Sequence, residues 1–240
     1  MGSVGDGIKA GSASWTFAGD VAKGFDGHVS KSVPLYNEGH HLTCELSDFF
    51  IQKDSVCYEI GASTGSLTMK LAKHNENKPG ARFIGIDVEP EMVKMANHKA
   101  REQGGQKNLE FIADDVLQME FEPCDMMVSY YVVQFVRPSQ RQQLIDKIYK
   151  SLNWGGAFVL FEKVRGADAR FQDISARMYD DYKLSQGYSP DEIVSKSRSL
   201  KGVMEPFSTQ GNIDLLKRAG FQDIMTVQKY ICFEGFLAIK

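Results

Sequence analysis

The 240-residue sequence predicts an α/β protein with a doubly wound, mostly parallel seven-stranded sheet, helices on both faces and a helical cover. Two observations predict this fold. Short apolar runs alternate with segments of helical periodicity. The first three runs also end in a glycine turn or in carboxylates, at Gly61, Asp87 and Asp115. Because ligands of a parallel sheet bind at the carboxyl ends of its strands, we expect these three groups to share one site.

We expect a single domain over residues 15–240, preceded by a tail at 1–14 that is rich in Gly, Ser and Ala and should be flexible. Residues 15–52 form an N-terminal cap. Trp15 and Phe17 open this cap, and either they anchor the tail or they close over a ligand. The cap contains two segments of helical character, 21–33 and 36–52.

The core of the chain then alternates strand and helix. The expected strands lie at 56–60, 82–87, 109–113, 125–131 and 156–162. The expected helices lie at about 65–74, 91–104 and 138–151. Gly104 and Gly105 end the second helix, and Pro138 opens the third. We expect a turn from Asn153 to Gly156, just before the fifth strand.

Residues 164–203 interrupt this alternation, and we expect them to form an inserted helical cover. A long helix should span about 168–185. Ser189 and Glu192 then fit a capping box, with a proline at the first helical position, for a helix that ends near residue 200. A helix at 211–218 and a closing hairpin of strands at 224–230 and 233–239 complete the expected fold.

Composition limits the classes of function. A net charge of −3 and a pI near 6.0 give little electrostatic support for a large nucleic-acid ligand. The four cysteines are far apart, and the adjacent pair His40 and His41 points in different directions, so we expect no metal site. No run is long enough for a membrane helix and no signal segment is visible, so we expect a cytoplasmic protein.

The stretch 56–67 combines a buried strand, a glycine turn and the start of a helix. Backbone N–H groups at the positive end of a helix can hold a polar ligand. The spacing Glu59-x-Gly61-x-x-x-Gly65 lacks a basic residue, and it fits neither the dinucleotide fingerprint nor the P-loop. It fits a nucleoside with an amino-acid tail better, although a tight connection is the alternative. The candidate contacts are Glu59, Gly61, Ala62, Ser63 and Gly65.

Two acidic strand ends extend this site. Asp87 ends the second strand, where a carboxylate accepts hydrogen bonds from ribose hydroxyls. Its alternative role, capping the helix that begins near Pro90, can hold at the same time. Asp115 follows the third strand and can accept from an adenine amine, the alternative being a solvated turn acid. The three strand ends together predict the fold of the class I S-adenosylmethionine (SAM) methyltransferases, which is Rossmann-like, with SAM as cofactor.

The fourth strand ends in two tyrosines, Tyr130 and Tyr131. One of them should face the sulfonium of SAM, because an aromatic face attracts a cation by roughly 0.5–2 kcal/mol. The alternative is that both pack under the helical cover. Methyl transfer depends mainly on the alignment of nucleophile, methyl group and sulfur, so we expect few catalytic side chains. Tyr179, on the expected cover helix, is a further candidate.

From Trp15 to the C-terminus the chain resembles the carboxy-S-adenosylmethionine synthases, a family with the methyltransferase fold. The motifs that support this resemblance are Trp15-Thr16-Phe17, Ser32-Val33-Pro34-Leu35-Tyr36, Gly61-Ala62-Ser63, residues 141–149, Gly155-Gly156, Glu162-Lys163 and Gly187-Tyr188-Ser189. The resemblance implies a homodimer that uses prephenate to make carboxy-SAM for a tRNA wobble-uridine modification. It also implies that SAM or its derivative contacts Tyr36, Gly61, Ala62, Ser63, Asp87, Val88, Asp115 and Val116.

The chain departs from the family pattern at two positions. Tyr130 stands where the family has an asparagine in the fourth strand. Ser197 stands where the family has an arginine that holds the added carboxylate, and Arg198 lies one helical step of about 100° further on. Without a bidentate arginine–carboxylate contact, the feature that distinguishes carboxy-SAM from SAM is lost. The candidate catalytic residues are therefore Tyr130, Tyr131, Tyr179, Ser197 and Arg198.

The sequence thus predicts a SAM-dependent enzyme that acts on a small molecule, most simply by methyl transfer to a second substrate. Three alternatives stay open. One is rearrangement of SAM itself, by cyclisation of its aminobutyrate arm to azetidine-2-carboxylate with release of methylthioadenosine. Another is synthesis of carboxy-SAM from prephenate, with Arg198 replacing the missing arginine. The last is a SAM-binding module without catalytic activity.

Overall fold

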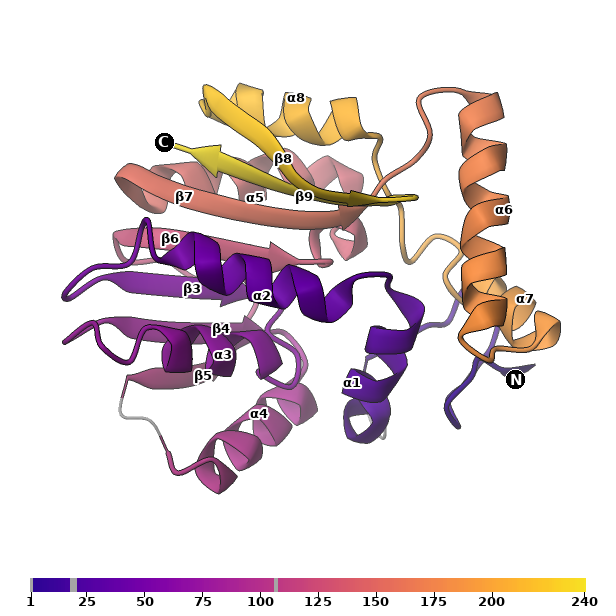
Figure 1. Cartoon of the computed structure of the whole chain (residues 1–240), viewed down its shortest axis with the longest axis horizontal. Coiled ribbons are helices and arrows are strands. Elements are labelled where there is room, and N and C mark those ends of the chain that lie inside the picture. Colours follow the sequence, from indigo (N-terminus) through magenta and orange to yellow (C-terminus); the bar gives the residue numbers. More distant parts are fainter. Residues whose placement is uncertain (1, 18–20, 106–107) are drawn as a thin grey trace.

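The computed structural model describes residues 2–17, 21–105 and 108–240, and its centre is the expected seven-stranded sheet (Figure 1). The strand order is β5-β4-β3-β6-β7-β9-β8, and β9 alone runs antiparallel to its neighbours. The strands are β3 (Val56–Ile60), β4 (Arg82–Asp87), β5 (Leu109–Ala113), β6 (Cys124–Tyr130), β7 (Leu152–Lys163), β8 (Asp223–Tyr230) and β9 (Phe233–Ile239).

Helices cover both faces of this sheet because its central strands are apolar on both sides. Tyr58 and Ile60 of β3 pack with the core on one face, which α5 (Pro138–Ser151) and α8 (Thr209–Ala219) cover. Cys57 packs on the other face, under α2 (Tyr36–Ser47) and α3 (Ser66–His74). The helix α4 (Pro90–Glu102) lies against β4 and β5. The prediction of a doubly wound fold is confirmed.

Two helices inserted after β7, α6 (Ala169–Ser185) and α7 (Pro190–Ser199), form the cover beside the carboxyl ends of the strands (Figure 1). The capping box predicted for the second helix is present, with Ser189 and Glu192 bonding reciprocally. The helix α1 (Val21–Ser32) lies on the same side of the sheet. None of the described helices is long and apolar enough to cross a membrane.

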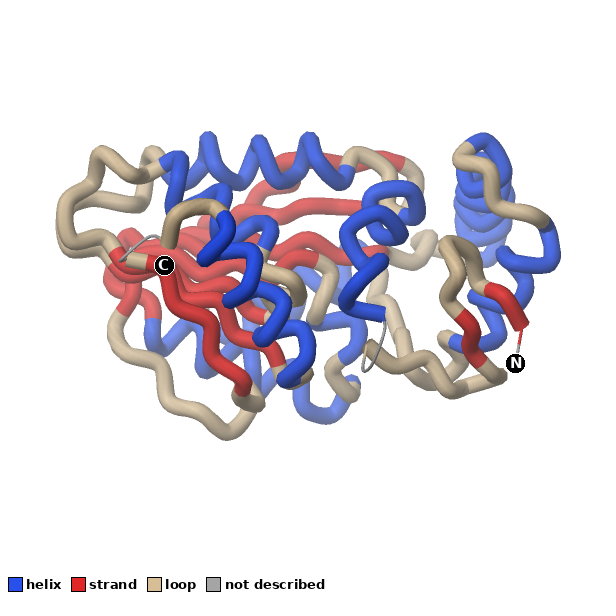
Figure 2. Tube along the Cα trace, turned by 90° about the horizontal axis from the view of Figure 1, so that it is seen from below, coloured by secondary structure: helices blue, strands red, loops and turns tan. Residues whose placement is uncertain are grey.

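The N-terminal segment differs from the expected mobile tail. It forms a short hairpin, β1 (Gly2–Ser3) with β2 (Lys9–Ala10), that packs beside α7 (Figure 2). The buried side chains of Val4 and Trp15 belong to a small apolar cluster there. The backbone of Trp15 also donates to the carbonyl of Ser199 at 3.1 Å, so apolar burial and hydrogen bonds together order the segment.

Two expected boundaries were wrong. The strand β7 already begins at Leu152, so the turn expected from Asn153 to Gly156 lies within the strand, where Gly155 has a φ of +79°. The strand β6 ends at Tyr130, one residue early, because Tyr131 takes the left-handed conformation with a φ of +64°. Because the chain changes direction here, Tyr130 and Tyr131 do not alternate between the two faces of the sheet as successive strand residues do. A short 3₁₀ helix, η1 (Val133–Phe135), follows.

Candidate active site

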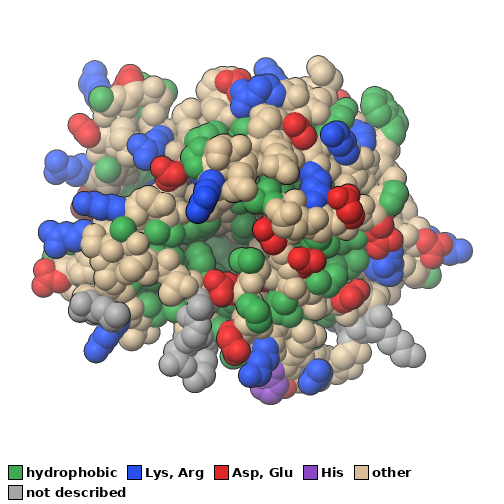
Figure 3. Space-filling view, turned by 180° about the vertical axis from the view of Figure 1, so that it is seen from behind, with side chains coloured by type: hydrophobic (Ala, Val, Ile, Leu, Met, Phe, Trp, Pro, Cys, Tyr) green, Lys and Arg blue, Asp and Glu red, His purple; other side chains and the backbone are tan. Residues whose placement is uncertain are grey.

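A cavity of about 1160 Å³ opens at the carboxyl ends of the parallel strands, between the sheet, α1 and the cover helices. Figure 3 shows hydrophobic side chains around this hollow, with acidic side chains along one rim. The structure brings together nearly all the candidate residues. Those that line the cavity are Tyr36, Glu59, Gly61, Ala62, Ser63, Asp87, Val88, Asp115, Val116, Tyr130, Tyr131, Tyr179, Ser197 and Arg198.

Gly65 is the exception among the candidate residues, because it does not line the cavity. Its φ is +78°, and a Cβ atom there would lie 2.4 Å from the ring of Phe111 and 3.0 Å from Cβ of Ala96. A glycine is needed here for the left-handed turn and for close packing between α3 and its neighbours. The sequence predicted that Gly65 stands at the start of α3. Whether this residue faces the cavity or the neighbouring elements depends on tertiary packing.

The turn after β3 is fixed to the neighbouring strand β4. Ala62 donates its N–H to the carbonyl of Ile86 at 2.8 Å, and Ser63 donates to Oδ2 of Asp87 at 2.8 Å. At Gly61, with a φ of +68°, a Cβ would lie 2.4 Å from Val132, so only glycine fits. The turn and the acid predicted from separate parts of the sequence therefore form one rigid edge of the cavity.

Asp87 lies at the edge of the cavity and holds the backbone just before α4, whereas its binding of ribose stays a prediction. Oδ1 accepts the N–H of Glu89 at 2.9 Å, at the start of α4, while Oδ2 holds Ser63. Burial raises the pKa of Asp87, and the backbone N–H bonds oppose that rise. Each carboxylate oxygen keeps a second lone pair, so Asp87 can accept two further hydrogen bonds from a ligand diol.

Glu59 is a buried carboxylate next to this edge, at only 4 % exposure. It accepts a hydrogen bond from the hydroxyl of Thr68 on α3. Burial raises its pKa to about 8, because taking a carboxylate out of water favours the neutral form. An ammonium group in the cavity would reverse this shift and pair with Glu59.

The acids after β5 form the far end of the cavity. Asp115 accepts the N–H of Leu117 at 2.9 Å through Oδ1, while its own N–H donates to Asp114. Val116 packs partly buried against the core, whereas Val88 is 65 % exposed at the rim. This end thus offers the carboxylates of Asp114 and Asp115 together with two apolar side chains.

Tyrosines line the opposite end, and we call Tyr36, Tyr130, Tyr131 and Tyr179 the tyrosine cluster. Tyr130 donates its hydroxyl to the carbonyl of Tyr36 at 2.7 Å, and the two ring centroids are 5.2 Å apart. The rings of Tyr130 and Tyr131 meet edge to face at 4.8 Å. Tyr179 reaches across from α6 and donates to the carbonyl of Ser32 at 2.9 Å. Desolvation raises the pKa of every tyrosine in the cluster, so all four are neutral donors near pH 7.

The cover contributes cations that sequence reasoning missed. Ser197 and Arg198 line the cavity as expected, but the neighbouring Lys196 is the more enclosed side chain. Its ammonium lies 2.8 Å from the centroid of the Trp15 ring and 3.2 Å from Nε2 of His28. Burial lowers the pKa of Lys196 to about 6. His28 lies 168 positions before Lys196 in the sequence, so no local pattern could reveal this contact.

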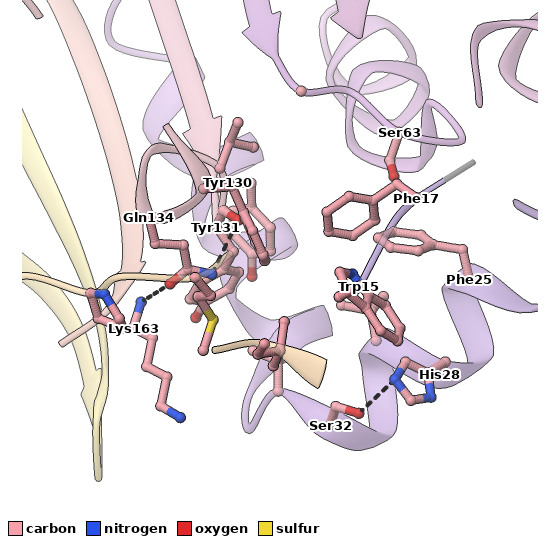
Figure 4. A pocket seen from close by; sticks show the side chains of 18 of the residues that line it. Trp15, Phe17, Phe25, His28, Ser32, Ser63, Tyr130, Tyr131, Gln134 and Lys163 are labelled. Atoms are coloured by element: carbon pink, nitrogen blue, oxygen red, sulfur yellow. Dashed lines mark hydrogen bonds between the residues drawn. The ribbon is translucent and has the colours of Figure 1, made fainter. Parts of the chain in front are cut away.

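The aromatic residues of the N-terminal cap form the second wall. Figure 4 shows Trp15, Phe17 and Phe25 across the cavity from Tyr130 and Tyr131. Trp15 anchors the N-terminal hairpin through its small apolar cluster, which is the first of the two roles left open for these aromatics. It also lines the cavity, and its closure over a ligand stays a prediction. A ligand between the walls would be enclosed by aromatic faces on two sides.

Solved structures support the same class of fold. A putative O-methyltransferase from Nostoc punctiforme matches with a TM-score of 0.64 and 17% identity, covering 92% of this chain and 59% of that one. Human N-acetylserotonin methyltransferase in complex with SAM matches with a TM-score of 0.56 and 19% identity, covering 85% and 51%. The family profile described as methyltransferase domain matches residues 58–156. The protein is a SAM-dependent enzyme of the class I methyltransferase superfamily.

Relatives of similar length narrow this class. The carboxy-S-adenosyl-L-methionine synthase of Staphylococcus epidermidis is 36% identical over 227 residues, which cover 94% of this chain and 97% of that protein. The enzyme of the same name from Nautilia profundicola is 38% identical and covers 93% of this chain and 94% of its own. The chain belongs to the carboxy-S-adenosyl-L-methionine synthase family.

Proposed function

We propose that the protein transfers a methyl group from SAM to a small molecule that enters the cavity beside the tyrosine cluster. In this arrangement Asp87 binds the ribose hydroxyls, and Asp115 and Val116 frame the adenine. The amino-acid end of SAM lies against the turn at Gly61 and next to Glu59. The carboxylate of Glu59 then pairs with the amino group of SAM.

The tyrosine cluster is the observation on which this proposal depends. A sulfonium is a cation without N–H or O–H donors, and aromatic faces stabilise such a cation by roughly 0.5–2 kcal/mol. At the end of β6, the ring centroid of Tyr130 lies 5.2 Å from that of Tyr36 and 4.8 Å from that of Tyr131. Enclosure between two aromatic walls would also fix the alignment of nucleophile, methyl carbon and sulfur.

Cyclisation of SAM is the second candidate, favoured by the same aromatic enclosure and by Tyr130 and Ser197 at the two departures from the family pattern. In this reaction the α-amine loses a proton and its nitrogen attacks the γ-carbon. The carbon–sulfur bond breaks and its electron pair leaves with methylthioadenosine, while azetidine-2-carboxylate forms. No second substrate is required.

Synthesis of carboxy-SAM is the third candidate. It is supported by the full-length similarity to relatives that bear this name. Ser197 cannot hold a carboxylate as an arginine does, so Arg198, which also lines the cavity, would have to bind it.

Mass spectrometry of the purified protein separates these candidates. One reaction contains SAM alone, and a parallel one contains SAM with prephenate. Methylthioadenosine from SAM alone would support cyclisation or another cleavage of SAM, and carboxy-SAM only with prephenate would support the family reaction. If SAM stays intact in both, S-adenosylhomocysteine formation in a screen of small acceptors supports methyl transfer. Tight SAM binding without any turnover would overturn all three and indicate a binding module.

A further inference from the structure

Lys196 lines the cavity from α7, and its amine has no carboxylate partner among the residues that the structure describes. Nζ instead lies 2.8 Å from the centroid of the Trp15 ring and 3.2 Å from Nε2 of His28. An aromatic face and a neutral imidazole replace only part of the hydration that a buried ammonium loses, so burial favours the neutral amine. A neutral amine carries a lone pair, and Lys196 can therefore accept a proton from a molecule in the cavity.

His28 joins this amine to a carboxylate that does not line the cavity. Nδ1 of His28 lies 2.9 Å from Oδ2 of Asp6 on the N-terminal hairpin, and Tyr188 donates to the same oxygen at 2.7 Å. Burial lowers the pKa of His28 to about 4, so its ring is neutral near pH 7. Because Asp6 accepts at Nδ1, that nitrogen carries the proton, and Nε2 keeps its lone pair toward Lys196. An ammonium that forms at Lys196 can donate to His28, with the negative charge of Asp6 behind it.

The acids near this chain of three residues are bound to partners other than Lys196. Lys31 donates to Oδ1 of Asp6 at 2.7 Å. Glu192, one turn before Lys196, accepts from the hydroxyl of Ser3 at 3.0 Å and caps the start of α7. Neither carboxylate therefore pairs with the amine. The titratable groups that the hairpin, α1 and the segment of α7 place near the chain are Asp6, His28, Lys31, Tyr188, Glu192 and Arg198.

Lys196 belongs to the wall of the cavity opposite the tyrosine cluster. Its neighbours Trp15 and His28 lie across the cavity from Tyr130 and Tyr131 (Figure 4). With the sulfonium beside the tyrosines, an acceptor between the walls would have the methyl group on one side and the amine on the other. Aromatic walls favour a flat aromatic acceptor, because edge-to-face and offset ring contacts are stabilising.

We propose that Lys196 is the base of the methyl transfer, and that the acceptor is a small aromatic hydroxyl compound. The inference rests on the proposed function, because it presumes that SAM lies beside the tyrosine cluster. The hydroxyl proton passes to the lone pair of Nζ, and the oxygen attacks the methyl carbon. The electron pair of the carbon–sulfur bond stays on the sulfur of S-adenosylhomocysteine. Asp6 and His28 are positioning residues for the new ammonium, which gives its proton to water when the products leave.

The test uses para-nitrophenol, whose absorption spectrum distinguishes the phenol from the phenolate, added to protein saturated with S-adenosylhomocysteine. A phenolate beside the ammonium of Lys196 stabilises both charges. We therefore expect the bound probe to ionise about one pH unit or more below the free probe, which is a tenfold change in acidity. Lys196→Met keeps the length of the side chain and should remove this shift. The methyl ether para-nitroanisole has no proton to give, and both proteins should bind it alike.

Two further variants separate proton acceptance from a general effect of charge. Asp6→Asn removes the negative charge behind His28 and should reduce the shift without abolishing it. Lys201→Met removes an exposed lysine that also lines the cavity, and it should leave the shift intact. Thermal melting of each variant controls for lost packing around the N-terminal hairpin.

Trp15 reports the protonation of Lys196 without any probe. The chain has two tryptophans, Trp15 and Trp154, so Trp154→Phe leaves Trp15 as the only one that emits. Because Nζ lies over the Trp15 ring, the emission should change in a single step near pH 6 as the amine takes up a proton. The step should vanish when Lys196→Met is added. It should move to lower pH with Asp6→Asn, since a lost negative charge weakens the binding of the proton.

A bound probe that ionises like the free one, a shift that survives Lys196→Met, or a Trp15 emission that stays constant between about pH 5 and 8 would overturn the base assignment. Failure of para-nitrophenol to bind would overturn the aromatic hydroxyl class. The proposed function fails in a different way. If the probe ionises as expected, but SAM and phenolic acceptors yield no S-adenosylhomocysteine, methyl transfer is wrong while proton transfer to Lys196 stands.

Discussion

The backbone N–H of Ser63 donates to Oδ2 of Asp87 at 2.8 Å, which joins the glycine turn after β3 to the end of β4. This bond orients the carboxylate, and the backbone N–H of Glu89 donates to its other oxygen, Oδ1, at 2.9 Å. Asp87 therefore does not have to be reorganised when a ligand arrives, and such preorganisation lowers the entropic cost of binding.

Replacing Asp87 with Ala should weaken SAM binding at least about tenfold, because two ligand hydrogen bonds to a charged acceptor are lost. Calorimetric titration with SAM measures this. The matched control is Glu91→Ala, which removes an exposed carboxylate of the same helix start that does not line the cavity. If both variants bind SAM like the wild type, the ribose assignment is wrong.

Replacing Tyr130 with Ala should lower turnover more than SAM affinity, because the ring helps to align nucleophile, methyl carbon and sulfur, while Asp87 supplies much of the binding. We expect turnover to fall about tenfold or more. Tyr130→Phe removes only the hydroxyl bond to the carbonyl of Tyr36 and should keep most activity. Thermal melting of both variants controls for lost packing. Undiminished turnover in the Ala variant would leave Tyr130 with a packing role alone.

Glu59 should make the unliganded protein less stable as the pH rises. Burial raises its pKa from 4.5 to about 8, so between these values the folded state holds a proton that the unfolded state has released. The contribution of the neutral carboxyl group to the free energy of unfolding is fully present below pH 4.5. It falls as the pH rises from 4.5 toward 8, by up to about 1.4 kcal/mol per pH unit.

The measurement for Glu59 is urea unfolding of the wild type and Glu59→Gln at several pH values from 5 to 8. The variant cannot ionise, so its free energy of unfolding should gain on that of the wild type as the pH rises. Glu162, whose pKa burial also raises to about 8, is present in both proteins and cancels in the difference. A difference that stays constant over this range would contradict the buried titration of Glu59.

We propose that the protein is a homodimer that uses α6. No residue of this helix is buried in the single chain, and Phe171, Ile174 and Met178 expose apolar side chains along one stripe. Tyr179 and Lys183, on another face, line the cavity. Light scattering after size exclusion should show a dimer for the wild type.

Met178→Glu should shift this population toward monomer, because it places a charge in the apolar stripe. Phe49→Glu is the control, since Phe49 is 78 % exposed but lies beyond the end of α2. A monomeric wild type at micromolar concentration, or a dimer that survives Met178→Glu unchanged, would exclude this interface.

Local patterns in the sequence were enough to predict the sheet and one edge of the cavity. Strand and helix periods are local, and the carboxyl ends of parallel strands meet at one edge, so Gly61, Asp87 and Asp115 could be placed together without coordinates. The placement of Tyr130 and Tyr131 at the end of β6 followed from the same rule. These inferences depend only on short-range patterns and on the topology that such patterns permit.

Tertiary structure alone decided the rest. The glycine at position 65 serves packing against Phe111, and Tyr131 leaves the strand with an unsatisfied hydroxyl. Lys196 of α7 meets His28 of α1 although 168 positions separate them in the sequence. Contacts of this kind join segments that are distant along the chain. Which residues make these contacts depends on how the side chains of the whole core pack together. The local periodicity of the sequence does not contain this information.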